Sequence, residues 1–140
     1  MAHQLGETVL VSGQIQARDI ALFAASGVTI IVNNRPDGEE AGQPAGAEIE
    51  AAARAAGLDY AHIPISNALS DDKVAAMGEA LANAEGNVLI YCKSGTRSAY
   101  LWALARARHG ADTDELIFQA ARAGYDLQPI LPWLKGEAKA

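Results

Sequence analysis

Cysteine, positive charge and long apolar segments are all scarce in this chain of 140 residues. The single cysteine, Cys92, excludes an internal disulfide and a zinc site built from several cysteines. A net charge of −6 argues against a surface for nucleic acid or anionic membrane. No apolar run approaches the roughly 18 residues of a membrane span, and the amino terminus lacks the regions of a signal peptide. We therefore expect a cytoplasmic, bacterial-type protein whose thiol stays reduced.

What is present is the composition of an ordinary folded domain, half apolar and one-fifth charged, and the length fits one domain over residues 1–140. Apolar runs predict strands at residues 8–14, 28–33, 58–65 and 88–92. Helical spacing predicts helices at residues 18–25, 45–56, 70–84, 98–109 and from 113 up to Gly124, with a short last turn at 129–134. Such alternation is typical of a parallel sheet with helices on both faces, and ligands of such sheets bind beyond the carboxyl ends of the strands.

The clearest chemistry lies between Val88 and Ser98, where an apolar strand ends at the only cysteine and a helical pattern follows. Gly95 indicates a tight loop whose backbone N–H groups point inward, and the following helix adds partial positive charge. The guanidinium of Arg97 adds a full charge and several donors. These groups favour a thiolate near neutral pH and hold an oxyanion beside the sulfur. We therefore predict a nucleophilic Cys92 in an anion-binding loop of the P-loop kind, with substrate contacts from Lys93, Ser94, Gly95 and Thr96.

Several of these residues also have a simpler structural interpretation. Cys92 alone would fit a buried structural thiol, and Lys93 either adds positive potential or points to solvent. Arg35, after another strand end, either guides an anionic substrate or braces a turn with Asp37. His62 fits a core or edge position better than a catalytic base. No carboxylate–histidine spacing indicates a metal site, and no cofactor is expected.

The order of these segments resembles dual-specificity phosphatases. The stretches at residues 27–36 and 60–64 and the Cys92 loop, within a match over about residues 5–124, are similar to a bacterial family called beta-lactamase hydrolase-like, phosphatase-like domain. The resemblance implies a three-layer α/β/α fold with a four-stranded parallel sheet of order 1-4-2-3. It also implies that Cys92 is the nucleophile, that Arg97 binds the oxyanion and that Ser98 donates a hydrogen bond to the thiolate. Tyr91 stands where these phosphatases usually have a histidine.

Two features depart from the phosphatase pattern. Four residues separate Cys92 from Arg97, whereas phosphatases of this class have five, and the shorter loop resembles that of rhodanese sulfurtransferases. The aspartate that protonates the leaving alcohol in phosphatases is replaced by the segment at residues 66–68, which contains no acid. The nearest acids in the sequence are Asp37, Asp71 and Asp72.

Sulfur transfer through a persulfide on Cys92 requires fewer catalytic groups than phosphate-ester hydrolysis, because no general acid is needed. A leaving sulfite or thiolate departs without a proton, and a loop one residue shorter suits a single sulfur atom. Members of the resembled family are also found fused to sulfide-metabolism modules, which favours the same sulfurtransferase function. The sequence therefore predicts a sulfurtransferase with a small anionic substrate and an external thiol acceptor, because no second cysteine is present. Phosphomonoester hydrolysis through a phosphocysteine and a non-catalytic anion-binding module remain as alternatives, and the oligomeric state is left open.

Overall fold

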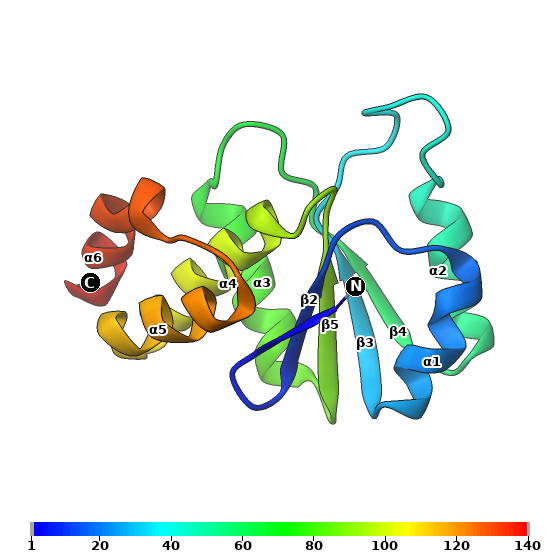
Figure 1. Ribbon diagram of the computed structural model, residues 1–140, viewed down its shortest axis with the longest axis horizontal. Helices are drawn as coiled ribbons and strands as arrows, with labels where there is room; N and C mark the ends of the chain where they lie inside the picture. Colours follow the sequence, from blue (N-terminus) through cyan, green and yellow to red (C-terminus); the bar gives the residue numbers. More distant parts are fainter. Residues whose placement is uncertain (1, 140) are drawn as a thin grey trace.

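A mixed sheet of five strands lies between two groups of helices in the computed structural model, which describes residues 2–139 (Figure 1). The strands follow one another across the sheet in the order β1-β2-β5-β3-β4. Their bounds are β1 His3–Leu5, β2 Val9–Ser12, β3 Val28–Asn33, β4 Asp59–His62 and β5 Asn87–Tyr91. All neighbours pair in parallel except β1, which is antiparallel to β2.

Helices cover both faces of this sheet. One face carries α1 (Ile20–Ala25), which follows a 3-10 turn at Ala17–Asp19, and α2 (Gly46–Ala55). The other face carries α3 (Asp71–Asn83), α4 (Thr96–Arg108), α5 (Thr113–Ala123) and α6 (Leu131–Lys139), the last preceded by a 3-10 turn at Gln128–Ile130. The three-layer arrangement agrees with the sequence-based expectation.

The expectation of a four-stranded sheet is wrong, because the sheet has five strands and its full order is β1-β2-β5-β3-β4. The four parallel strands β2, β5, β3 and β4 do follow the expected order 1-4-2-3. The additional strand is β1, a three-residue segment too short and too polar to show an alternating pattern. A tight turn folds it back onto β2, with Gly6 at a φ of 71° and the Gln4 side chain donating to the backbone carbonyls of Gly6 and Glu7. Leu5 then buries its side chain, which fixes the pairing.

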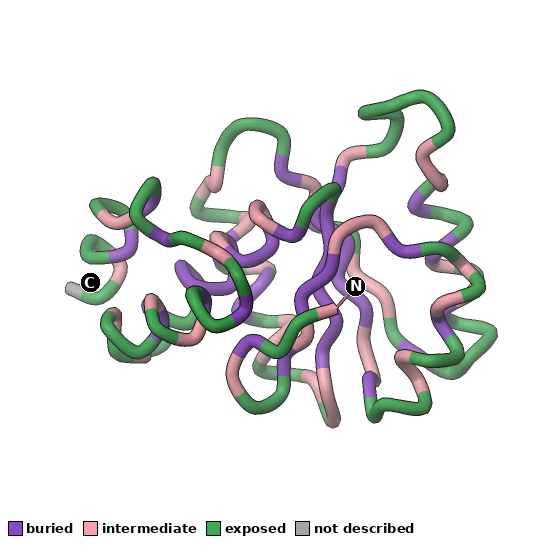
Figure 2. Tube along the Cα trace, in the orientation of Figure 1, coloured by how far each residue is buried: buried purple, intermediate pink, exposed green. Residues whose placement is uncertain are grey.

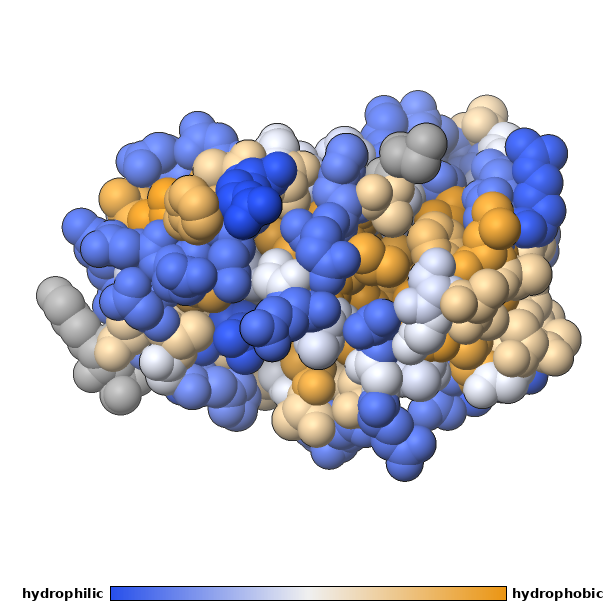
Figure 3. Space-filling view, turned by 60° about the horizontal axis from the view of Figure 1, so that its bottom comes forward, coloured by the Kyte–Doolittle hydropathy of each residue, from blue (hydrophilic) through white to orange (hydrophobic). Residues whose placement is uncertain are grey.

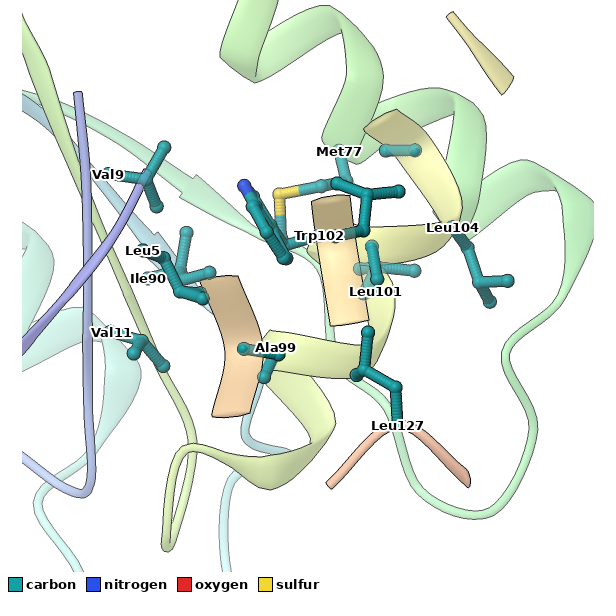
Figure 4. Packing of buried hydrophobic residues seen from close by; sticks show 14 of the residues in the cluster. Leu5, Val9, Val11, Met77, Ile90, Ala99, Leu101, Trp102, Leu104 and Leu127 are labelled. Carbon is teal, nitrogen blue, oxygen red and sulfur yellow. The ribbon is translucent and has the colours of Figure 1, made fainter. Parts of the chain in front are cut away.

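The larger core lies between the sheet and the α3–α6 face, and α4 runs through its centre (Figure 4). Trp102 of α4 is 1% exposed and packs with Met77 of α3 and with the sheet residues Val9 and Ile90. A second core, including Ile31, fills the space under α1 and α2. Because α4 is apolar on nearly every side, its packing fixes where its first turn stands relative to β5.

The surface is mostly polar. On the face shown in Figure 3, hydrophilic side chains predominate, and apolar ones gather mainly on the side of α1 and α2. Within the described range 2–139, no helix combines the length and apolar character needed to cross a membrane.

Most predicted elements are present with shifted ends. The helix expected at residues 98–109 begins earlier, at Thr96, and the strand expected to reach residue 65 ends at His62, before Pro64. The short last turn expected at 129–134 is a 3-10 turn that continues as α6 to Lys139.

Candidate active site

Three loops meet at the carboxyl end of the parallel strands (Figure 1). They are the β3–α2 loop (residues 34–45), the β4–α3 loop (residues 63–70) and the Cys92 loop (residues 92–97). Strands β3 and β5 beneath them are mostly buried, whereas the edge strand β4 is partly exposed and much of the β3–α2 loop is exposed (Figure 2). Parallel pairing places these loops at the same edge of the sheet, where ligands of such folds bind.

Cys92 lies directly after β5 and is fully buried. Its Sγ accepts a hydrogen bond from the backbone N–H of Gly95 at 3.1 Å. The loop after β2 braces the other side, since the N–H of Gln14 donates to the Lys93 carbonyl at 3.2 Å. One backbone N–H group of the Cys92 loop is thus directed at the sulfur.

Gly95 permits this conformation. Its φ is 94°, in the region that glycine adopts without strain, and a Cβ atom here would lie 2.1 Å from the hydroxyl oxygen of Tyr125. Tyr125 in turn donates to the Ser94 carbonyl at 3.1 Å. Tyr125 is a contact of the Cys92 loop that the sequence did not indicate, because it comes from the distant segment after α5.

Arg97, in the first turn of α4, stands beside Cys92. Its Nη1 donates to the Ile65 carbonyl at 2.7 Å, which ties the guanidinium to the β4–α3 loop. Its pKa is raised mainly by hydrogen bonds to Glu39 and also by its nearness to Cys92. A cation next to a thiol favours its ionised form.

Glu39 is the residue that the sequence analysis missed. Its carboxylate accepts from Nη1 and Nη2 of Arg97 at 2.6 and 3.0 Å and from Nε of Arg35 at 2.8 Å. The Arg97 hydrogen bond is the largest of the causes that lower the pKa of Glu39 to about 2. The adjacent Glu40 pairs with Arg35 at 2.8 Å and with Lys93 at 3.2 Å. Two consecutive glutamates in a loop after a strand end were the available signal.

These contacts assign Arg35 a role that neither interpretation included. It is 3% exposed and its guanidinium binds Glu39, Glu40 and the side chain of Gln14, so it holds the acidic part of the β3–α2 loop over the site. Asp37 lies in a turn, but its carboxylate accepts from the N–H of Gly46 at 2.7 Å and is not among the partners of the Arg35 guanidinium.

Ser98 has a different partner from the one that the resemblance implied. Its hydroxyl donates to Oδ1 of Asn34 at 2.7 Å, and not to the sulfur of Cys92. The N–H of Asn34 donates to the Tyr91 carbonyl and its Nδ2 donates to the Ile63 carbonyl. Ser98 and Asn34 are fully buried, so together they connect α4 to the ends of three strands.

The three candidate acids are bound elsewhere. Asp37 caps α2, Asp71 pairs with Arg108 at 2.6 Å, and Asp72 accepts a hydrogen bond from Ser70. No cluster of metal-ligating side chains is found in residues 2–139.

The remaining predicted residues lie around the loop. Lys93 and Ser94 are exposed, and Ser94 donates to the hydroxyl oxygen of Thr96 at 3.2 Å. The buried hydroxyl of Tyr91 has no hydrogen-bond partner in the described structure, and burial raises its pKa. His62, at the edge strand β4, contacts the carbonyl of Arg35 through Nε2 at 2.9 Å.

Solved structures of known proteins share this fold. A proposed phosphatase from Neisseria meningitidis is 33% identical, superposes with a TM-score of 0.84 and covers 96% of each chain. Human DUSP28 is 18% identical, with a TM-score of 0.67 over 99% of this chain and 96% of its own, and shares the fold alone.

Sequence comparison gives the family. Curated beta-lactamase hydrolase-like proteins from Xylella fastidiosa (strain Temecula1) and Agrobacterium fabrum are 39% identical over 136 residues and 36% identical over 141. These matches include 96% and 99% of this chain but only 32% and 33% of the relatives, so the chain spans about one third of their length. The family model described as "Beta-lactamase hydrolase-like protein, phosphatase-like domain" matches residues 2–109. The chain therefore belongs to the family of phosphatase-like domains of beta-lactamase hydrolase-like proteins.

Proposed function

We propose that this domain is a sulfurtransferase that carries sulfane sulfur as a persulfide on Cys92. The observation that carries the proposal is how the nearby acids are engaged: the Glu39 carboxylate is bound by Arg97 and Arg35, and residues 66–68 contain no acid. Asp37, Asp71 and Asp72 are engaged elsewhere. Chemistry whose leaving group needs no proton fits this site.

The first step is attack of the Cys92 thiolate on the outer sulfur of an anionic donor. A sulfur–sulfur bond forms at Cys92, the donor's own sulfur–sulfur bond breaks, and the electron pair leaves with sulfite or a thiolate. The N–H of Gly95, the amino-terminal end of α4 and the Arg97 guanidinium stabilise the negative charges.

The second step returns the enzyme to its starting state. An external thiolate attacks the outer sulfur of the persulfide, takes it and releases the Cys92 thiolate. The acceptor is external because the chain has one cysteine. The four-residue spacing between Cys92 and Arg97 supports this assignment, since a shorter loop encloses a smaller volume around the sulfur.

Access to the sulfur requires movement of the β3–α2 loop. Cys92 is fully buried and Glu39 occupies the donors of Arg97. An incoming anion replaces the Glu39 carboxylate at Arg97 and displaces the acidic part of the loop. The Glu39–Arg97 pair therefore stands in for the anionic substrate in this structure.

Phosphomonoester hydrolysis through a phosphocysteine is the second candidate, favoured by the family and by the likeness to the proposed Neisseria phosphatase. A leaving alcohol needs a proton. In this second function Glu39, once released from Arg97, regains an ordinary pKa and acts as the acid. Phosphate-ester hydrolysis thus needs Glu39 as a proton donor, whereas sulfur transfer does not need the Glu39 carboxyl.

One experiment separates the two functions. The protein is incubated with thiosulfate and, separately, with an aryl phosphate, and the intact mass and the released phosphate are measured. We expect a mass gain of one sulfur atom that Cys92→Ser abolishes and that Arg97→Ala slows without changing the circular dichroism spectrum. Phosphate release that depends on Cys92, with no gain of sulfur, would contradict the proposal.

A further inference from the structure

A cavity of about 550 Å³ opens beside Arg97, and its lining is mainly apolar. It is lined by the β4–α3 loop, by Arg97 and Tyr100 of α4, and by the segment from the 3-10 turn into α6. This volume is in the range of cavities that hold a small organic molecule.

The charge of the lining restricts the occupant. Among the described residues that line the cavity, Arg97 alone carries a charge. Its hydrogen bond to the Ile65 carbonyl keeps the guanidinium at the boundary between the cavity and Cys92. A ligand that matches this lining has one negative end and an apolar body. A peptidic thiol with several charged groups would leave those groups without partners here.

Trp133 points to the same kind of ligand. Its side chain is 64% exposed although it lines the cavity, whereas the chain's other tryptophan, Trp102, is 1% exposed. Tyr100 and Ile130 lie in the same lining. An aromatic or branched apolar group placed here covers surface that is otherwise in contact with water.

We propose that the sulfur donor is an organic thiosulfonate, R–SO₂–S⁻, whose apolar group R occupies this cavity while its sulfonyl oxygens contact Arg97. This inference rests on the proposed sulfurtransferase function. The Cys92 thiolate forms a bond to the outer sulfur, the bond between that sulfur and the sulfonyl sulfur breaks, and the electron pair leaves with the sulfinate R–SO₂⁻. Charge is conserved, and no proton or external reductant is needed.

The kinetic test compares benzenethiosulfonate with inorganic thiosulfate. The rate of sulfur gain at Cys92, followed by rapid quench and intact mass, gives a kcat/KM for each donor. We expect benzenethiosulfonate to be preferred at least about tenfold, and Trp133→Ala to lower this preference about tenfold through loss of apolar contact. Phe118→Ala is the matched control, because Phe118 is an aromatic residue 57% exposed outside the cavity lining. An unchanged preference in Trp133→Ala would overturn the inference.

A binding test separates the cavity from the chemistry. Benzenesulfonate has no transferable sulfur, and its affinity is compared with that of sulfate by titration calorimetry. We expect tighter binding of benzenesulfonate and loss of that advantage in Trp133→Ala. If this holds while no donor delivers sulfur to Cys92, the sulfurtransferase function fails and the assignment of the cavity to organic anions stands. If sulfur is transferred but the two anions bind equally, the cavity assignment fails while the sulfurtransferase function stands.

Discussion

At the scale of single residues, the site is defined by pairs of opposite charge. Arg97, Arg35 and Lys93 are each paired with Glu39 or Glu40, so the positive charge expected around Cys92 is balanced by two glutamates of the β3–α2 loop. Lys93 and Glu40 are 53 positions apart in the sequence, and Arg97 and Glu39 are 58 apart, because the two partners of each pair come from different loops. The sequence shows the two adjacent glutamates, but the cations with which they pair depend on the fold.

The pH dependence of stability reports the Glu39 contact. The carboxyl has a pKa of about 2 in the folded protein, below the ordinary value of 4.5, so its contribution is complete above the ordinary pKa and is lost as pH falls towards 2. We expect wild type to exceed Glu39→Gln in urea midpoint at pH 7 and this difference to shrink between pH 4.5 and pH 2. A difference that stays constant over this range would contradict the assignment.

At the scale of elements, the amino-terminal end of α4 is fastened to the strand ends by buried polar contacts. The Ser98 hydroxyl donates to Asn34, and Asn34 donates to the carbonyls of Tyr91 and Ile63. These bonds place Arg97, one residue before Ser98, at a fixed height over β5. Ser98 thus supports the site through the backbone of α4, without contact to the sulfur.

Removal of the Ser98 hydroxyl tests this role. Ser98→Ala leaves Oδ1 of Asn34 buried without its donor, at a cost of about 1–3 kcal/mol. Ser94→Ala is the control, because Ser94 is exposed and its contact to Thr96 is on the surface. Urea denaturation followed by circular dichroism measures both variants, and equal stability of the two would refute the structural role.

Much of this level of structure could be predicted from the sequence. The β-branched run from Val28 to Asn33 and the apolar run into Cys92 identified β3 and β5, and helical spacing identified α4. Strand β1 could not be predicted, because three residues paired through a turn and one buried leucine carry no periodic signal. The Ser98–Asn34 bond joins residues 64 positions apart and depends on the fold as a whole.

At the scale of the whole molecule, one large core determines the stability of the platform under the site. Trp102 lies at the centre of this core, between the sheet and α3 (Figure 4). The two termini of the described chain lie on different parts of the fold, β1 at the sheet edge and α6 beyond α4 (Figure 1).

Substitution of the two tryptophans compares the stability contribution of a buried side chain with that of an exposed one. Trp102→Ala removes a fully buried indole and leaves a cavity, so we expect a loss of about 3–5 kcal/mol in the free energy of unfolding. Trp133→Ala removes a side chain that is 64% exposed, and we expect a change below about 0.5 kcal/mol. Urea denaturation is followed by circular dichroism, because removal of a tryptophan changes the fluorescence signal. Similar losses in both variants would contradict the described core.

The central claim is that Cys92 accepts sulfur without a general acid and that Glu39 only occupies the anion site. The most direct test is the intact mass of Glu39→Gln during exposure to thiosulfate, with Glu40→Gln as the matched control. Because Glu39→Gln frees Arg97 for the donor, we expect it to gain one sulfur at least as fast as wild type. Loss of sulfur gain in Glu39→Gln, with the reaction retained in Glu40→Gln, would contradict the account.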